Sequence, residues 1–197
     1  MQRELFKLIV ALTIISSLAA ATLAMVYDTT KGPIAEQKRV KMIRSLKGVL
    51  PEFDNEIDKD ISEVILGKDS RGMDKKVTFF NARSGGNLVG VAFKVIAPDG
   101  YKGDIEIMMG VSPERKITGI EILGHRETPG LGDKIADKWW KDEFKGKSLE
   151  GSKIAVKKDG GEIDQFTGAT ISPRAVADAV RSGLELYKKE HKDGRSG

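Results

Sequence analysis

A long uncharged segment near the N-terminus dominates the hydrophobic pattern of this chain. It runs from Leu8 to Tyr27 and contains 20 residues without a charge. As an α-helix it would span about 30 Å, which matches the hydrocarbon core of a bilayer. A cleaved signal peptide is the alternative, because Ala19–Ala21 and Ala24 offer small residues, but signal-peptide apolar cores usually have only about 7–15 residues. The pattern therefore predicts an uncleaved transmembrane anchor over about 8–27, within an N-terminal region of residues 1–30.

The residues that flank this segment predict its orientation. Arg3, Lys7 and the N-terminal amine precede it, and positive residues are retained on the cytoplasmic side of a membrane. We therefore expect a single-pass protein of the cell (inner or cytoplasmic) membrane. Its N-terminus is expected to be cytoplasmic and its C-terminal domain extracytoplasmic.

The pattern between the anchor and residue 75 is helical. Thr29–Pro33 has the composition of a linker, and Pro51 closes the periodic stretch that follows. A short second helix is expected around Ile57–Ile65, ending at Gly67. Residues 31–75 are thus predicted to form a helical linker or packing region. The apolar face of its first helix consists of Val40, Ile43, Leu46 and Leu50.

From Val77 onward apolar and polar residues alternate, as is typical of strands. Short turns separate these segments, and short connections favour antiparallel pairing. The expected class is therefore α+β: the transmembrane helix, then one exported domain with a mainly antiparallel sheet flanked by helices (residues 76–190), then a polar tail (191–197). The predicted strands are Val77–Phe80, Leu88–Ile96, Asp104–Val111 and Ile117–Leu123.

Two helices and a weak strand are predicted after this sheet. The first helix is expected from about Asp133 to Phe144, and the weak strand over Ser152–Val156. The last helix is expected to start with Ser172 as its N-cap and Pro173 as its first helical residue. Its apolar positions recur with a helical period at Val176, Val180, Leu184 and Tyr187.

The composition argues against several functional classes. The 197 residues carry a net charge of +4, without a basic stripe interleaved with aromatics, so no nucleic-acid partner is expected. Cysteine is absent, which rules out disulfides and thiolate-held metal sites in this polypeptide. With only two histidines no metal-ligand cluster is predicted, and His125 is expected to be a hydrogen-bonded structural residue. No nucleophile–base pair is apparent, so no catalytic residue is assigned.

The segment Asp164–Thr170 carries the most specific chemistry of the chain. Thr170 lies just ahead of the predicted last helix, where the positive end of the helix dipole favours a phosphate. Gly168 permits an unusual backbone conformation, and Ala169 leaves room for a bulky group. An ordinary junction between a loop and a helix is the alternative interpretation.

Two motifs in this sequence resemble the covalent FMN-binding domain family, whose members include the G-type subunits of Rnf ion-translocating complexes. The first is Asp-x-x-Thr-Gly-Ala-Thr at 164–170, and the second is His-x-Glu-Thr-Pro-Gly-Leu-Gly at 125–132. In that family a flavin transferase moves FMN from FAD onto the last hydroxyl of the first motif. The resemblance, which covers essentially the whole chain, thus implies FMN bound covalently through its phosphate to Thr170.

The resemblance also implies the remaining cofactor contacts. Pro129 and Gly130 suit a type II turn, and backbone N–H groups near Gly130 and Leu131 are candidate donors to the flavin; a stiff loop entering a helix is the alternative. The Trp139–Trp140 pair is better explained as core than as a flavin-stacking platform. The Lys157–Gly161 stretch could be a phosphate-binding loop, but a solvated hairpin turn explains it equally well, and no Walker-type spacing follows it. The expected cofactor-binding residues are Asp164, Thr167, Gly168, Ala169, Thr170, Ile171, Ser172, Glu127, Thr128, Gly130 and Leu131.

The function implied by the resemblance is electron relay by a subunit that is not a self-contained enzyme. The complex would pass electrons between ferredoxin and NAD and move Na⁺ or H⁺, with these sites in other membrane and peripheral subunits. Two alternatives are a C-type subunit of a Na⁺-translocating NADH:quinone oxidoreductase, usually a longer chain, and an anchored scaffold domain without a redox role.

Overall fold

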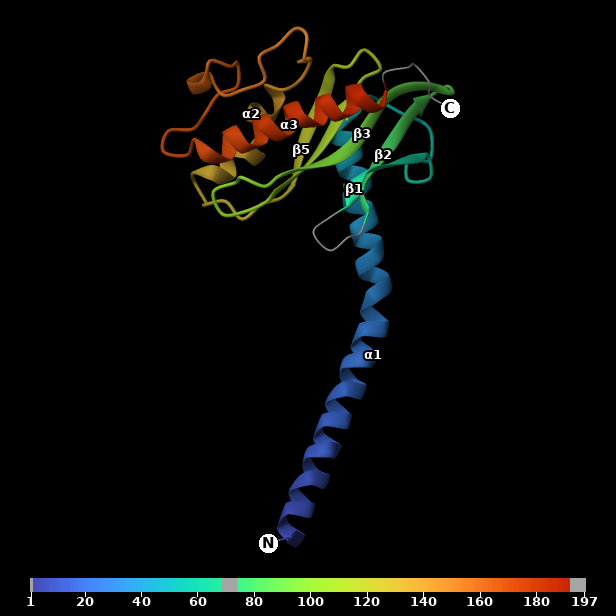
Figure 1. The fold of residues 1–197 in the computed structure, drawn as a ribbon. Coiled ribbons are helices and arrows are strands. Elements are labelled where there is room, and N and C mark those ends of the chain that lie inside the picture. The colour runs from blue at the N-terminus through green and yellow to red at the C-terminus, as the bar shows by residue number, and fades with distance from the viewer. Residues whose placement is uncertain (1, 69–73, 192–197) are drawn as a thin grey trace. The chain divides into compact units, whose positions relative to one another are not determined.

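The computed structural model describes residues 2–68 and 74–191, and its elements follow one another as labelled in Figure 1. By its internal contacts the chain divides into two compact units, Met1–Met42 and Ile43–Gly197. The α+β class expected from the sequence is confirmed by a long apolar N-terminal helix and an antiparallel sheet accompanied by helices.

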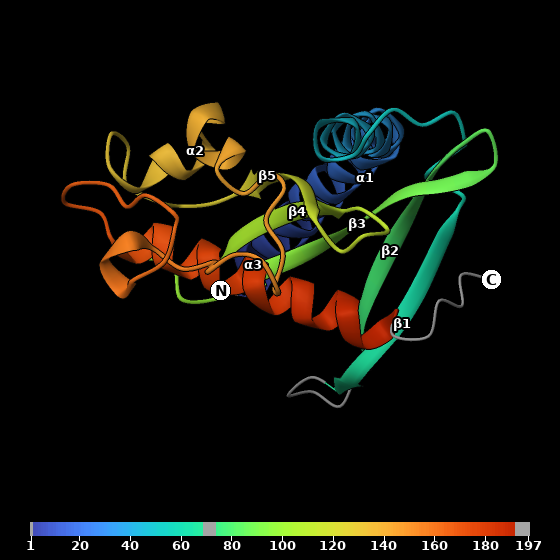
Figure 2. The ribbon, with the colours of Figure 1, turned by 90° about the horizontal axis from the view of Figure 1, so that it is seen from above.

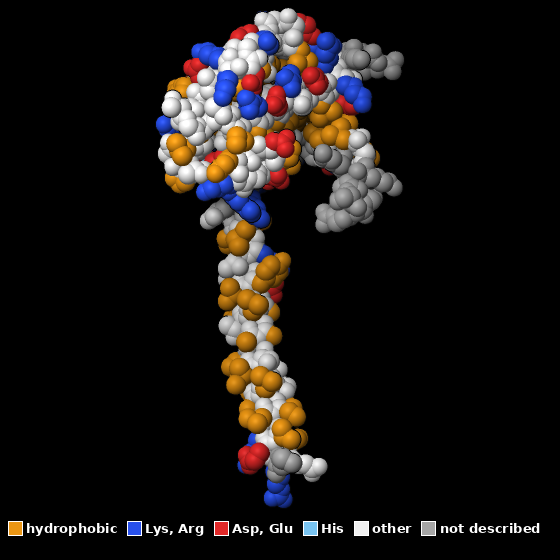
Figure 3. All heavy atoms as spheres, turned by 60° about the vertical axis from the view of Figure 1, so that its left-hand side comes forward, with side chains coloured by type: hydrophobic (Ala, Val, Ile, Leu, Met, Phe, Trp, Pro, Cys, Tyr) orange, Lys and Arg blue, Asp and Glu red, His pale blue; other side chains and the backbone are white. Residues whose placement is uncertain are grey.

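The first unit belongs to helix α1 (Gln2–Val49), which is long and apolar enough to cross a membrane. None of its most apolar window is buried, and Figure 3 shows hydrophobic side chains along its visible face. The linker predicted at Thr29–Pro33 is wrong, because the helix continues through Pro33. Pro33 lacks a backbone N–H and so removes only one hydrogen-bond donor from the helix. The Thr29 and Thr30 hydroxyls donate to the Met25 and Val26 carbonyls, four residues back, as such side chains do inside helices.

The second unit is built on a five-stranded sheet in the order β1-β2-β3-β4-β5, in which all pairs are antiparallel. The four strands predicted between Val77 and Leu123 are present, and three of them extend further than expected. The helix predicted around Ile57–Ile65 is wrong, because Ile61 and Ile65 pair with residues of β2. The bounds are Ile61–Lys68 for β1, Asp74–Ser84 for β2, Asn87–Ala97 for β3, Ile105–Val111 for β4 and Ile117–Gly124 for β5.

Helix α3 (Ile171–Glu190) lies across one face of the sheet (Figure 2) and buries its apolar stripe against β3 and β4. Phe79 and Phe93 belong to the same buried core, with ring centroids 4.8 Å apart. The predicted N-cap at Ser172 is wrong: Thr170 is the N-cap residue and Ser172 lies inside the first turn. The helix that covers this face of the sheet therefore begins directly after the Asp164–Thr170 segment.

The opposite face of the sheet accommodates the last turn of α1. Val49 and Leu50 are buried there, and three glycines on neighbouring strands leave the space that they occupy. A Cβ on Gly110 would lie 2.2 Å from the Val49 carbonyl oxygen, and one on Gly119 would lie 3.1 Å from the Val49 Cα. The Thr118 hydroxyl donates to the same Val49 carbonyl, so this helix end is fixed to the sheet backbone.

The segment between β5 and α3 contains only short helices, namely η1 (Gly132–Ala136), α2 (Lys138–Asp142) and η2 (Lys157–Asp159). The single helix predicted from Asp133 to Phe144 is wrong, because Asp137 adopts an extended conformation with ψ 138°. The predicted strand Ser152–Val156 is also wrong: within this part of the described chain Val156 forms only an isolated bridge with Ile163. Between β5 and α3 the chain therefore packs against the core mainly as loops.

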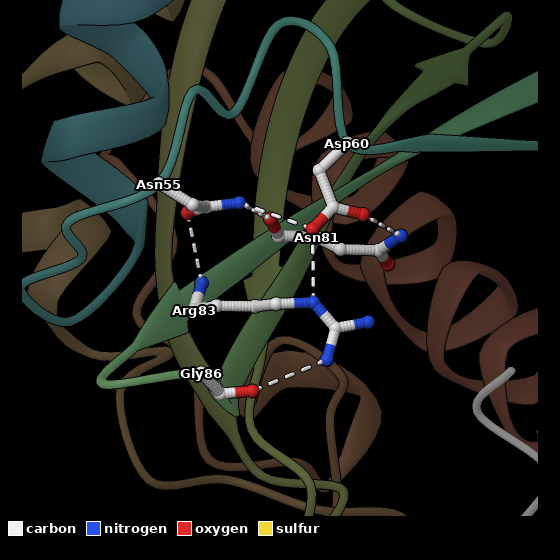
Figure 4. Close-up of polar contacts among 5 residues, drawn as sticks. All are labelled: Asn55, Asp60, Asn81, Arg83 and Gly86. Atoms are coloured by element: carbon white, nitrogen blue, oxygen red, sulfur yellow. Dashed lines mark hydrogen bonds and ion pairs between the residues drawn. The ribbon is translucent and has the colours of Figure 1, made fainter.

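A polar cluster joins the segment before β1 to β2 and to the following turn (Figure 4). The Asp60 carboxylate accepts hydrogen bonds from Asn81 Nδ2 (3.0 Å) and Arg83 Nε (2.9 Å). Asn55 donates to Asp60 (3.2 Å) and accepts from the Arg83 N–H (2.9 Å), while Arg83 Nη1 donates to the Gly86 carbonyl (3.5 Å). Burial raises the pKa of Asp60, but these hydrogen bonds and the Arg83 charge together bring it below its usual value.

Candidate functional site

A cavity of about 310 Å³ opens where three segments of the second unit meet. These segments are the turn between β3 and β4, the loop after β5, and the start of α3. Most of its lining is apolar or uncharged, and such a composition is typical of ligand sites. The lining residues are Tyr101, Glu127, Thr128, Leu131, Gly132, Gly168, Ala169, Thr170, Ile171 and Ser172.

The loop after β5 forms the tight corner that the Pro129-Gly130 pair predicts. Gly130 has φ 75°, and the Leu131 N–H donates to the Thr128 carbonyl at 3.1 Å. The Asp133 N–H reaches the same carbonyl at 3.4 Å. The Leu131 N–H, expected from the sequence as a donor to the flavin, is therefore used within the turn.

Glu127 connects the three segments around the cavity. Its side chain is buried, with 5% of the residue exposed. Its Oε2 accepts from Ser172 Oγ at 2.5 Å, and its Oε1 accepts from the Lys102 N–H at 3.1 Å. Its own N–H donates to His125 Nδ1 at 3.2 Å, which is the structural hydrogen bond expected for this histidine. The carboxylate thus holds the β3–β4 turn and the first turn of α3 in place.

Small residues keep the space between these segments open. A Cβ on Gly132 would lie 2.7 Å from both Glu127 Oε2 and Ser172 Oγ. Gly168 has φ 80°, which a residue with a side chain rarely adopts, and a Cβ there would lie 3.8 Å from Leu131 Cδ2. Glycine at both positions therefore preserves the cavity.

Thr170 lies on the cavity wall as the N-cap residue of α3. Its side chain makes no capping hydrogen bond, and its carbonyl accepts from the Arg174 N–H at 3.3 Å. The residue is half-buried. Thr170 therefore lines the cavity at a helix N-terminus, and its hydroxyl does not cap the helix.

Eight of the predicted site residues line this cavity, whereas Asp164, Thr167 and Gly130 do not. The Asp164 carboxylate forms an ion pair with Lys157, and this pair raises the pKa of Lys157. The Asp164 N–H donates to Glu143 Oε2 at 2.8 Å. Burial raises the pKa of Glu143, and the neighbouring Asp164 charge adds to this shift.

The two tryptophans lie apart from the cavity lining. Trp140 is fully buried, and its Nε1 donates to the Asp164 carbonyl at 2.7 Å. Trp139, which the sequence places on or near the buried side, is 54% exposed and contacts the Phe166 ring edge-on. Trp140 therefore fits the core interpretation, and the placement of Trp139 is corrected because the helix that carries it is short and begins at Lys138.

Sequence reasoning missed two lining residues, Tyr101 and Gly132. Gly132 ends the second motif, so its proximity to Leu131 was the available signal. Tyr101 follows the turn-forming residues Pro98–Gly100 and is 63% exposed. An exposed aromatic beside a turn was the only indication of its position. Among the described residues no cluster of His, Asp and Glu suited to a metal ion is found.

The fold and this site define an FMN-binding domain: the family model described as "FMN-binding domain" matches residues 100–185, which include the whole cavity lining. The chain is similar to the G subunit of the ion-translocating oxidoreductase complex of Aliivibrio fischeri (strain ATCC 700601 / ES114), with 40% identity over 193 residues, 94% of this chain and 90% of the relative. The protein of the same name from Shewanella baltica (strain OS223) is 37% identical over 183 residues, covering 89% and 86%. This chain belongs to the family of G subunits of ion-translocating oxidoreductase complexes, as its two motifs indicated.

A solved structure shares the fold. The crystal structure of Shewanella oneidensis NqrC superposes with a TM-score of 0.50 over 65% of this chain and 80% of that chain. The two sequences are 18% identical, so this similarity concerns the fold alone.

Proposed function

We propose that this chain is a membrane-anchored flavoprotein subunit that carries FMN on Thr170 and relays electrons within an ion-translocating oxidoreductase complex. The observation that carries the proposal is the position of Thr170. This residue lines the cavity at the N-terminus of α3, and its side chain makes no capping hydrogen bond. Membership in a family of complex subunits with an FMN-binding domain supports the same function.

The lining fits such a group. Thr128 and the Thr170 hydroxyl offer polar contacts, while Tyr101, Leu131 and Ile171 offer exposed apolar surface at the cavity. The cavity volume of about 310 Å³ is at the lower end of the range for ligand sites, about 300–1,000 Å³. FMN in this site would supply one- and two-electron redox chemistry, whereas the residues of the chain fix its position and exclude water.

Loading requires a flavin transferase and FAD. The Thr170 oxygen forms a bond to the phosphorus nearer the flavin, the pyrophosphate P–O bond breaks, AMP leaves, and the hydroxyl proton passes to solvent. The resulting ester carries one negative charge, which the N-terminus of α3 stabilises. A covalent link also prevents loss of the cofactor by dissociation outside the cytoplasm. Three predicted site residues lie outside the cavity lining, namely Asp164, Thr167 and Gly130. In this proposal they either fix the conformation of the loops around the cavity or contribute to recognition by the transferase.

The N-terminal segment would hold the domain at the membrane. We assign residues 1–30 to the cytoplasmic tip and anchor, 31–75 to a connecting and packing region that also supplies β1 to the sheet, 76–190 to the FMN-binding domain and 191–197 to the tail. Lys7 and Arg3 precede the apolar run and favour an extracytoplasmic domain. By family resemblance, ferredoxin, NAD and the transported Na⁺ or H⁺ would bind to partner subunits.

Mass spectrometry of natively produced protein tests the attachment directly. Wild-type chain and Thr170→Ala are expressed with the transferase, and the peptide spanning position 170 is analysed beside in-gel flavin fluorescence after denaturation. We expect an FMN-sized addition on wild-type Thr170 and a dark band for Thr170→Ala, with Ser182→Ala, which removes an exposed hydroxyl later on α3, as the matched control that keeps its fluorescence. Unmodified Thr170 in wild-type protein, or fluorescence retained by Thr170→Ala, would contradict the proposal.

A further inference from the structure

The charge of the cavity is unusual for a site that receives a phosphate. Among the described residues that line it, Glu127 is the only charged one, and none is Lys or Arg. Phosphate sites ordinarily combine helix N-termini or backbone N–H groups with cationic side chains. Here the formal charge of the lining is negative.

Both oxygens of the Glu127 carboxylate accept hydrogen bonds, from Ser172 Oγ (2.5 Å) and from the Lys102 N–H (3.1 Å). The residue is 5% exposed, so water screens its charge poorly. Among the side chains that the structure describes, no cation forms an ion pair with this carboxylate.

Glu127 and Thr170 line the same cavity. Ser172, which donates a hydrogen bond to the carboxylate, lies in the first turn of α3, two residues after Thr170. A phosphate on Thr170 and the Glu127 carboxylate would therefore share the positive end of α3. The phosphate of free FMN carries a charge close to −2 at neutral pH, by analogy with other phosphate monoesters, whereas its threonine ester carries −1.

From this arrangement we propose that Glu127 is a specificity-determining residue that disfavours free FMN and admits the flavin only as the singly charged ester. The inference rests on the proposed function, because it concerns the same FMN site. The ester bond, and not affinity for the phosphate, then retains the cofactor. Free FMN consequently competes poorly for the cavity before Thr170 is loaded.

Equilibrium binding to the full-length Thr170→Ala chain in detergent tests this proposal, since that variant cannot form the ester. Free FMN and uncharged riboflavin are titrated, with flavin fluorescence as the readout. We expect riboflavin to bind more tightly than FMN. Adding Glu127→Gln should tighten FMN binding by about tenfold or more through removal of one like charge, and should leave the riboflavin affinity within about twofold. Glutamine retains an oxygen that can accept from Ser172.

A matched control separates local charge from net charge. Glu185 is exposed on α3, 14 residues after Ile171 and thus about 20 Å along the helix, so Glu185→Gln should change neither affinity. Equal tightening of both flavins by Glu127→Gln, no tightening of FMN, or binding of neither flavin by any variant would overturn the inference. If the wild-type chain still carries FMN on Thr170, the proposed function survives such a result; if Thr170 is unmodified in natively produced protein, the proposed function fails by itself.

Discussion

At the scale of single residues, the site depends on groups that allow three segments to approach closely. Gly132 is a direct example, since any side chain there would meet the Glu127–Ser172 hydrogen bond. We predict that Gly132→Ala lowers the free energy of unfolding by about 1–3 kcal/mol, the usual cost of overpacking, because a Cβ would lie 2.7 Å from both side-chain oxygens. Denaturant titration of the detergent-solubilised chain measures the change.

The matched control for this substitution is Gly124→Ala, since nothing lies within 4 Å of a Cβ at that position. Its effect should stay within about 0.5 kcal/mol, as for other substitutions that disturb no contact. Equal stability of the two variants would show that the Glu127–Ser172 contact tolerates displacement.

The polar cluster around Asp60 gives a prediction that depends on pH. The pKa of Asp60 in the folded chain is lower than its ordinary value, so this group stabilises the fold above its unfolded pKa of about 4 and loses that contribution as pH falls through the folded pKa. At pH 7, Asp60→Asn should lower the free energy of unfolding by about 1–3 kcal/mol. The difference from wild type should shrink below about pH 4.

An exposed carboxylate provides the comparison for this pH dependence. Asp142 forms ion pairs with Lys138 and Lys145 on the surface of α2, and such pairs contribute little because solvent screens them. Asp142→Asn should therefore change stability much less than Asp60→Asn at pH 7. If wild type and Asp60→Asn differed in stability by the same amount at pH 7 and at pH 3, the role assigned to the Asp60 charge would be contradicted.

Most residues of the candidate site could be predicted from local sequence motifs. The others join the site only because segments that are distant in the sequence pack together. Thr170 and Glu127 belong to short motifs whose neighbours already indicate a helix start and a rigid turn, so both could be singled out from the chain. Tyr101 joins the cavity only because the β3–β4 turn packs beside the loop that holds Glu127. Asp164 was placed in the site by its motif, yet its carboxylate pairs with Lys157 outside the cavity lining.

At the scale of elements, the contact between the end of α1 and the sheet yields a third prediction. Gly110→Ala would bring a Cβ to 2.2 Å from the Val49 carbonyl oxygen and 2.4 Å from Thr118 Oγ1, which leaves little room to adjust. We predict a loss of about 1–3 kcal/mol or more in the free energy of unfolding. Thermal or denaturant unfolding, followed by circular dichroism, provides the measurement.

A glycine near the end of α1 provides a control substitution that should raise, not lower, the free energy of unfolding. Gly48 is helical, and a Cβ at that position would meet nothing within 4 Å, so Gly48→Ala should stabilise the chain by up to about 1 kcal/mol. If Gly110→Ala were as stable as wild type, the last turn of α1 would not be held against β4 as described.

Some elements adopt the structure that their own hydrophobic pattern predicts, whereas others adopt the structure that pairing or packing with another segment imposes. The hydrophobic pattern predicted β2 to β5, although parts of β3 and β4 are buried on both faces. Ile57, Ile61 and Ile65 repeat every four residues, which also suits a helix, but pairing with β2 makes Ile61–Lys68 a strand. The break at Asp137 has no proline or glycine to announce it, so the division of the predicted helix into η1 and α2 depends on tertiary packing.

At the scale of the whole molecule, the chain joins an apolar helical segment to an FMN-binding domain within one polypeptide. The apolar run of α1 is long enough to cross a bilayer. The side of the membrane proposed for the domain rests on a few flanking charges, and this proposal leads to the final prediction.

The sidedness of the membrane can be measured with single introduced cysteines, because the chain itself contains none. Gln2→Cys and Lys189→Cys place thiols at exposed positions near the two ends of the described chain. In intact spheroplasts a membrane-impermeant maleimide should label Lys189→Cys at least about tenfold more than Gln2→Cys, because positive residues before the apolar segment favour a cytoplasmic N-terminus. Detergent lysis should make the two labelling levels equal. Preferential labelling of Gln2→Cys in spheroplasts would reverse the proposed orientation, and a mature Gln2→Cys chain that has lost its introduced cysteine would indicate a cleaved signal peptide instead of an anchor.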